Sequence, residues 1–120
     1  MDKMQALQAF WKQFGWSAYD ETSVPDTAQL PYITYEASTD NFGNTIAQTA
    51  SIWSRSTSWA EAVGMQKDIE AIIGRGGTFQ PFDGGAIWIK RGTPFAQRMA
   101  DDSSDTIRRV VLNIEAEFID

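Results

Sequence analysis

The sequence contains no cysteine and no histidine. Their absence excludes disulfide scaffolds, Cys/His zinc sites, thiol nucleophiles, and serine or cysteine catalysis that depends on an imidazole base. An enzyme built from this chain would have to use carboxylates, lysines, tyrosines or a metal held by carboxylates. The range of chemistry open to the protein is therefore narrow.

Basic residues and long apolar runs are also scarce. Ten Lys and Arg stand against sixteen Asp and Glu, which gives a net charge of -6 at pH 7. Because nucleic-acid binding needs a concentrated basic surface, we expect no sequence-specific nucleic-acid partner. No apolar run approaches the roughly 18 to 20 residues that span a bilayer, and the N-terminal stretch lacks the apolar centre of a signal peptide. We therefore expect no membrane partner and a location in the cytoplasm of the cell that makes the protein.

The charge is distributed unevenly along the chain. Residues 19–54 include five acidic residues and no basic one, whereas residues 75–100 carry Arg75, Lys90, Arg91 and Arg98 against Asp83 alone. Such a distribution allows one face of a subunit to meet the opposite face of its neighbour. The alternative is a solvated surface on which like charges cluster by chance.

The length is typical of a single domain covering residues 1–120, and two segments have the periodicity of amphipathic helices. Residues 2–14 place apolar side chains at spacings of three and four before Gly15. Ser58-Trp59-Ala60-Glu61 matches a capping box, in which the serine hydroxyl accepts from the amide three residues on, and an apolar stripe continues to Ile73. The sequence therefore predicts helices over 2–14 and 58–73, with a long ordered loop over 16–30.

Four segments have the alternation of strands. Residues 32–37 and 45–54 flank turn-forming residues at 40–44 and should form an antiparallel hairpin. Residues 85–91 read as a short strand, and residues 107–119 alternate clearly between apolar and polar side chains. The predicted fold is an α+β two-layer sandwich in which two helices cover one face of a mostly antiparallel four-stranded sheet, in the order α-β-β-α-β-β.

Two features that suggest catalysis have simpler explanations. The glycines at 74–77 follow a predicted helix and lack a Lys-Ser/Thr pair, so they fit a helix-ending turn better than a phosphate-binding loop. Carboxylate pairs remain as candidate acid-base or metal groups, namely Asp101 and Asp102 with Asp105, and Glu115 with Glu117. The first group lies in a serine-rich loop and the second on the polar face of a strand. We therefore predict no catalytic, cofactor or metal site and a protein that is not an enzyme.

Other features suggest contacts with partner proteins. Trp53 and Trp88 lie on the strand face opposite the main aliphatic side chains, so each is a candidate contact on an outer sheet surface unless a loop of the same chain covers it. Residues 91–105 separate two strands that should pair, although hairpin loops usually have about two to five residues. We interpret this segment as an arm that orders against a partner, the alternative being plain disorder. The candidate interface residues are Trp53, Arg55, Trp88, Arg91, Phe95, Arg98 and Met99.

Four strings carry a resemblance to a known family: residues 30–36 (LPYITYE), 52–59 (IWSRSTSW), 81–85 (PFDGG) and 92–98 (GTPFAQR). Together they resemble the tail-completion, or tail-terminator, proteins, which are small neck or minor tail proteins of siphophages and of prophages of Gram-positive bacteria. The resemblance covers nearly the whole chain. The predicted order of elements is also similar to the tail-terminator fold, in which a sheet backed by two helices assembles into a hexameric ring.

The resemblance implies a structural virion protein that acts as a ring of subunits, caps or completes the tail tube and helps to join tail to head. Its implied partners are copies of itself, the tail tube protein and a head-tail connector or stopper protein, with DNA passing through the ring. The net negative charge is compatible with such passage. The alternatives are a head-tail connector or tail-assembly factor of the same neck region and, more remotely, a carboxylate-dependent enzyme or a small-ligand-binding module.

Overall fold

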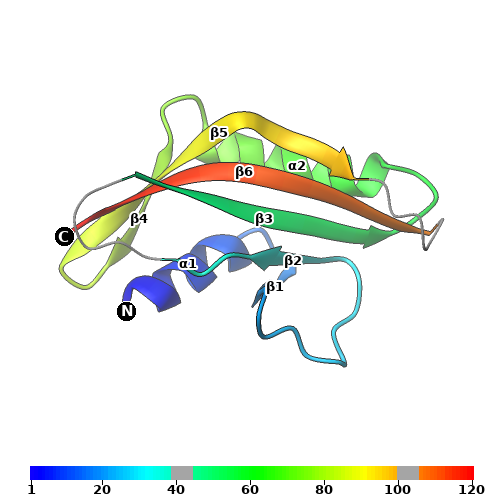
Figure 1. Cartoon of the computed structure of the whole chain (residues 1–120), viewed down its shortest axis with the longest axis horizontal. Coiled ribbons are helices and arrows are strands. Elements are labelled where there is room, and N and C mark those ends of the chain that lie inside the picture. Colours follow the sequence, from blue (N-terminus) through cyan, green and yellow to red (C-terminus); the bar gives the residue numbers. More distant parts are fainter. Residues whose placement is uncertain (39–44, 100–105) are drawn as a thin grey trace.

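The computed structural model describes residues 1–38, 45–99 and 106–120, which form two helices and six strands (Figure 1). Helix α1 spans Lys3–Lys12 and helix α2 spans Ala60–Ile73. The strands are β1 (Ser17–Asp20), β2 (Tyr32–Tyr35), β3 (Thr45–Arg55), β4 (Thr78–Phe82), β5 (Gly85–Met99) and β6 (Ile107–Ile119). Neither of these helices has the length and apolar character of a membrane span.

The six strands form one sheet in the order β1-β2-β3-β6-β5-β4. Strand β1 runs parallel to β2, and each of the other neighbouring pairs is antiparallel. The sheet is mixed and curls into a half-barrel (Figure 1). The predicted four-stranded sandwich with the order α-β-β-α-β-β is therefore wrong.

The two unpredicted strands, β1 and β4, are the edges of the sheet. Strand β1 lies inside the segment for which the sequence predicts a loop, and its four residues are too few to show a period. It forms because Ala18 is buried against the core and pairs with Ile33 of β2. Strand β4 contains Pro81, which lacks a backbone N–H and is tolerated because the strand has a neighbour on one side only.

The core lies on the concave face of the sheet. In β3 and β6 the predicted alternation is confirmed, since Ala50 and Ile52 pair with Leu112 and Val110 and all four are buried. Helix α1 contacts the two edge strands β1 and β4, whereas α2 contacts β3, β6 and β5. Both helices add buried side chains to the same apolar cluster, so they fill the hollow of the curled sheet.

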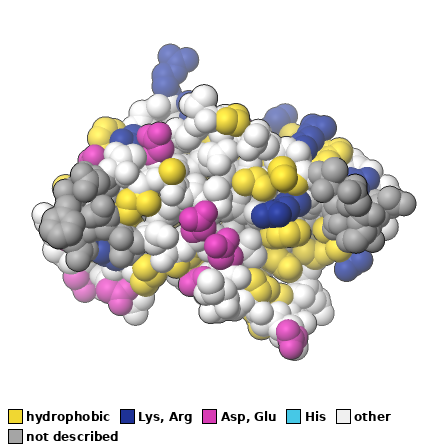
Figure 2. Space-filling view, in the orientation of Figure 1, with side chains coloured by type: hydrophobic (Ala, Val, Ile, Leu, Met, Phe, Trp, Pro, Cys, Tyr) yellow, Lys and Arg dark blue, Asp and Glu magenta, His cyan; other side chains and the backbone are white. Residues whose placement is uncertain are grey.

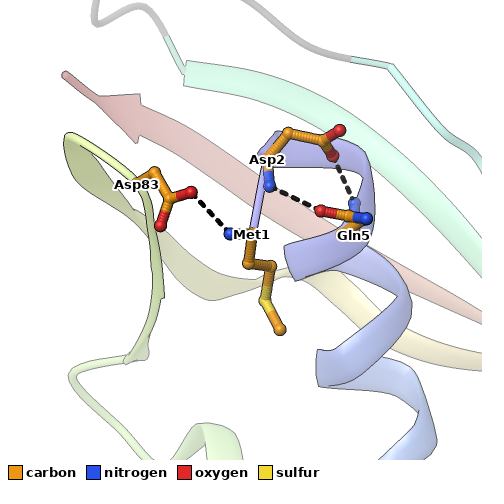
Figure 3. Close-up of polar contacts among 4 residues, drawn as sticks. All are labelled: Met1, Asp2, Gln5 and Asp83. Atoms are coloured by element: carbon orange, nitrogen blue, oxygen red, sulfur yellow. Dashed lines mark hydrogen bonds and ion pairs between the residues drawn. The ribbon is translucent and has the colours of Figure 1, made fainter.

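The start of α1 is fixed to the turn between β4 and β5 (Figure 3). The Asp2 carboxylate accepts from the Gln5 amide at 2.8 Å, and the Gln5 side chain accepts from the Asp2 amide at 2.9 Å, which is a capping box. The Met1 ammonium group lies 2.6 Å from Asp83 Oδ2 in that turn. These contacts join the first residues of the chain to an element about eighty residues later.

The predicted capping box of the second helix does not form. The N-cap of α2 is Trp59, which makes no side-chain capping hydrogen bond. The Ser58 hydroxyl instead accepts from the amide of Ala60, two residues on, at 3.1 Å. The helix therefore begins later than the sequence motif predicts, and it continues to Ile73 as predicted.

The arm predicted at 91–105 is also wrong over the residues that the structure describes. Strand β5 continues to Met99 and pairs with β6, with one irregularity between Arg91 and Ala96. Phe95 and Ala96 pack against the core, which holds this part of the strand on the sheet. Residues 100–105, with Asp101, Asp102 and Asp105, lie outside the described residues, as does the whole turn predicted at 40–44.

Candidate subunit interface

Trp53 lies on the outer, convex face of the sheet and contacts the strands on both sides of β3. The register aligns Trp53 with Arg109 and Met99 across β3, β6 and β5. The Arg109 guanidinium carbon lies 4.6 Å from the Trp53 ring centre, and its Nε donates to the Ser51 hydroxyl at 3.1 Å. The indole Nε1 donates to Thr34 Oγ1 at 3.0 Å. Side chains of the neighbouring strands therefore cover part of Trp53.

A second ring, Trp59, lies close to two arginines. The guanidinium carbons of Arg98 and Arg108 lie 5.1 Å and 5.5 Å from its ring centre. Arg108 also donates to the Thr57 carbonyl at 3.0 Å. Arg98 pairs in register with the core residue Val110, so it points to the side of the sheet that the helices cover. Arg98 therefore faces away from the surface that carries Trp53.

Trp88 forms a third cluster at the other edge of the sheet. Its ring stacks on that of Phe79, with centres 5.6 Å apart, and the Lys90 ammonium lies 4.2 Å from the Trp88 ring centre. The indole Nε1 donates to the Gly76 carbonyl at 3.0 Å. A Cβ at Gly77, which has a φ of +88°, would lie 2.6 Å from that nitrogen. Glycine at this position is thus what allows the turn to pack against the tryptophan.

A cavity of about 480 Å³ opens beside Trp88, where the turn after α2 meets the irregularity of β5. Three basic residues, Arg75, Lys90 and Arg91, line it together with Trp88 and Phe95. Glu115 supplies the one carboxylate among the described residues of the lining. We call this the basic cavity. A site with this lining suits an anionic partner that also carries apolar groups.

Figure 2 shows the sheet from the side opposite α2. Apolar and basic side chains gather on the right, where β3 ends and β6 begins, and acidic side chains lie chiefly in the middle and on the left. The predicted interface residues therefore fall into groups at separate places. Trp53, Met99 and the exposed Arg55 lie toward the end of β3, whereas Trp88, Arg91 and Phe95 lie around the basic cavity.

Sequence reasoning did not identify Arg75, Lys90, Phe79 or Arg109 as members of these clusters. Arg75 and Lys90 stand fifteen positions apart and meet because β4 folds back on β5. The alternation of β6 does place Arg109 on the polar face, but only the register with β3 sets it over Trp53. Strand alternation indicates a face, whereas the partner of a side chain depends on strand order.

The carboxylates do not form a metal site in the described part of the chain, where no group of three or more could hold an ion. Glu115 and Glu117 pair with Ala47 and Thr45 on the outer face.

At the β1 edge, the Thr22 backbone amide and hydroxyl donate to Asp20 and lower its pKa. Burial, and then the negative charge of Asp20, raise the pKa of Tyr35. Asp20 therefore keeps its charge, which makes that edge acidic.

The fold belongs to the class of curled mixed sheets whose concave side is filled by two helices. A chain of a solved structure, "Virion of native gene transfer agent (GTA) particle", has a similar fold, with a TM-score of 0.58 and 18% sequence identity. The similarity covers 97% of this chain and 90% of that chain. At this identity the comparison shows a shared fold. No protein-family model and no curated protein matches the sequence.

Proposed function

We propose that this protein is a structural subunit of a phage-like virion and has no catalytic role. The observation that carries the proposal is the fold similarity to a chain of a gene transfer agent virion, which extends over nearly the whole length of both chains. A similarity that leaves no large part of either chain unmatched favours a comparable structural task over a domain borrowed for another use. The protein then works inside a virion, through contacts with other virion proteins.

Within the virion, we assign the chain to the end of the tail, as a ring that completes the tail tube and helps to join it to the head. The resemblance of residues 30–36, 52–59, 81–85 and 92–98 to tail-completion proteins supports this position. The net charge of -6 supports it too, because DNA that leaves the head must pass the ring without binding to it. The ring is hexameric in this proposal, and its neighbours are the tail tube protein and a head-tail connector or stopper protein.

A head-tail connector of the same neck is the second candidate. The fold similarity favours it as much as the first, because the similar chain comes from a whole virion particle and so fits a component at either position. The basic cavity gives no support to a carboxylate-dependent enzyme, since its described lining holds three cations and one carboxylate rather than paired acids. The two neck positions differ in the defect that loss of the protein should cause.

Electron microscopy of particles assembled without this protein tests the proposal. Loss of a tail-completing ring should give tails of abnormal length that do not join heads, and supplying the intact chain should restore them. Tails of normal length beside unjoined heads would indicate the connector position instead. Infectious particles of normal shape would overturn a structural role at the neck.

A further inference from the structure

The two edges of the sheet carry opposite charge. Residues 13–38, which include β1 and β2, contain Asp20, Glu21, Asp26 and Glu36 and no basic residue. The basic cavity lies at the other edge, beside β4 and β5. Figure 1 shows the connection between β1 and β2 on the lower side of the molecule and the turn between α2 and β4 on the upper side. A single chain thus presents an acidic segment and a basic site on opposite sides.

The cations of the basic cavity form no ion pair among the residues that the structure describes. Within residues 1–38, 45–99 and 106–120, no carboxylate lies within ion-pair distance of Arg75, Lys90 or Arg91. These three cations outnumber Glu115, the one carboxylate in the described lining, which pairs in register with Lys90. The cavity therefore has a net positive charge, which a partner that carries negative charge would neutralise. Trp88 and Phe95 line the same cavity, so apolar groups of that partner would also find contacts there.

The acidic segment is held in shape before any contact forms. Its base is fixed by the Glu21 amide, which donates to the Tyr35 carbonyl at 2.9 Å. The Ser23 amide donates to the Asp20 carbonyl at 2.9 Å, and the Ala28 amide donates to the Pro25 carbonyl at 3.0 Å. The side chains of Glu21 and Asp26 are exposed. Such a segment loses little conformational freedom when it binds.

We infer that the segment between β1 and β2 of one subunit docks into the basic cavity of the next, with Glu21 and Asp26 facing Arg75, Lys90 and Arg91. The inference rests on the proposed ring and names the contact that builds it. Because the two surfaces are different and lie on opposite sides, the contact is head to tail, and repetition of the contact produces a ring or a filament rather than a two-fold dimer. The net charge of -6 makes copies repel at a distance, so complementary charge at the contact favours one register over others.

Cross-linking tests the contact. Because the chain has no native cysteine, a thiol-specific reagent reacts only at the introduced positions. Thr27→Cys and Gly76→Cys are two exposed single variants that keep every charge. When they are mixed with a flexible bismaleimide, we expect a heterodimer that forms at least about tenfold faster at low salt than in 1 M salt, because screening weakens the ion pairs. The double variant should give a ladder of oligomers.

The control mixture pairs Gly76→Cys with Gly64→Cys, which lies on the exposed side of α2. The contact is absent if the control mixture cross-links as fast as the test mixture. The same conclusion follows if Thr27→Cys or Gly76→Cys alone forms a homodimer as fast as the mixture forms the heterodimer, since that result indicates a two-fold arrangement.

Charge reversal supplies a second test, made in proteins that also carry the two cysteines used for cross-linking. Glu21→Lys/Asp26→Lys and Arg75→Glu/Arg91→Glu should each slow cross-linking between like copies by about tenfold or more, and mixing the two reversed proteins should restore it. Glu61→Lys/Asp68→Lys changes the net charge as much as the first pair on exposed α2 positions and should have no effect. Unchanged rates in all reversed proteins would overturn the contact.

The outcomes of these tests distinguish a failure of the proposed contact from a failure of the proposed function. Particles that need the protein for tail completion but tolerate both charge reversals would leave the virion role standing and remove this contact. Rapid, salt-sensitive cross-linking of a protein whose loss leaves particles normal would keep the contact and remove the virion role. If the reversals abolish joining to tails without changing cross-linking between copies, the occupant of the cavity is a tail protein and the inference is wrong.

Discussion

The end of the sheet around Trp53 and Trp59 differs from the edge around Trp88 in how its cations are used. At the first, Arg109 lies over Trp53 and donates to Ser51, and Arg108 lies beside Trp59 and donates to a backbone carbonyl. At the second, Lys90 lies over Trp88, but neither it nor Arg75 and Arg91 meets a carboxylate among the described residues. Arg108 and Arg109 each donate a hydrogen bond within the subunit, whereas the cations of the second cluster have capacity for a partner.

Because of this difference, substitutions in the two regions should affect different properties, namely the stability of the subunit in one and its assembly in the other. A side chain whose contacts are all inside the subunit contributes to the free energy of unfolding. A side chain without an internal partner contributes little to it and acts only when a second surface binds. Stability and assembly measurements on matched variants therefore separate the two regions.

The largest expected effect is at Trp53. Replacing it by alanine removes a half-buried ring, the cation contact with Arg109 and the hydrogen bond to Thr34, so Trp53→Ala should lower the free energy of unfolding by about 2 to 3 kcal/mol. Urea denaturation followed by circular dichroism measures the change. Phe79→Ala is the matched variant at the other edge, where the ring is 59% exposed, and should cost less than about 1 kcal/mol. Equal losses would remove the distinction between the two regions.

A smaller effect, confined to high pH, is expected at Tyr35. Its ring stacks on Trp11 and its hydroxyl donates to Gln8, while burial and then Asp20 raise its pKa from the ordinary value of 10.0. Since the unfolded chain releases the proton first, the contribution of Tyr35 to stability is complete below about pH 10 and is lost as the pH rises through the higher folded-state pKa. Urea denaturation between pH 8 and pH 11 should show a decline that Tyr35→Phe reduces.

Asp20→Asn sharpens this test because it removes the smaller cause and leaves burial in place. The decline at high pH should then lessen but persist. If Tyr35→Phe leaves the decline unchanged, the buried hydroxyl does not account for it.

Long, regular elements of this fold could be predicted from the sequence, and short or interrupted ones could not. The strands that became β3 and β6 alternate over more than ten residues each, which fixes both their extent and the face they bury. Strand β1 has four residues, and it is a strand because it pairs with β2. Strand β5 contains Gly92 and Pro94, which are typical of loops, yet core contacts of Phe95 keep the chain on the sheet beyond them.

For the candidate interface, the sequence predicted which face of a strand a side chain occupies but not which residues it contacts. Alternation correctly placed Trp53 and Trp88 on the outer face, because it requires no knowledge of neighbouring strands. It did not separate Arg91, beside the basic cavity, from Arg98, which lies against Trp59. That separation depends on the irregularity in β5 and on the position of α2, and both follow from tertiary packing.

The smallest expected effect on stability is at the basic cavity. Variants of this cavity test most directly whether the two regions differ in function. Arg75 and Arg91 are exposed and unpaired in the described chain, so Arg75→Ala/Arg91→Ala should change the free energy of unfolding by less than about 0.5 kcal/mol. Arg109→Ala, beside Trp53, should lower it by about 1 to 2 kcal/mol because the variant loses contact with both the Trp53 ring and the Ser51 hydroxyl. Sedimentation and electron microscopy of the same proteins should show the reverse order, with the cavity variant defective in self-association and the Arg109 variant close to normal. If the cavity variant instead loses as much free energy of unfolding as the Arg109 variant, these cations stabilise the subunit itself. The cavity would then give no evidence of a partner.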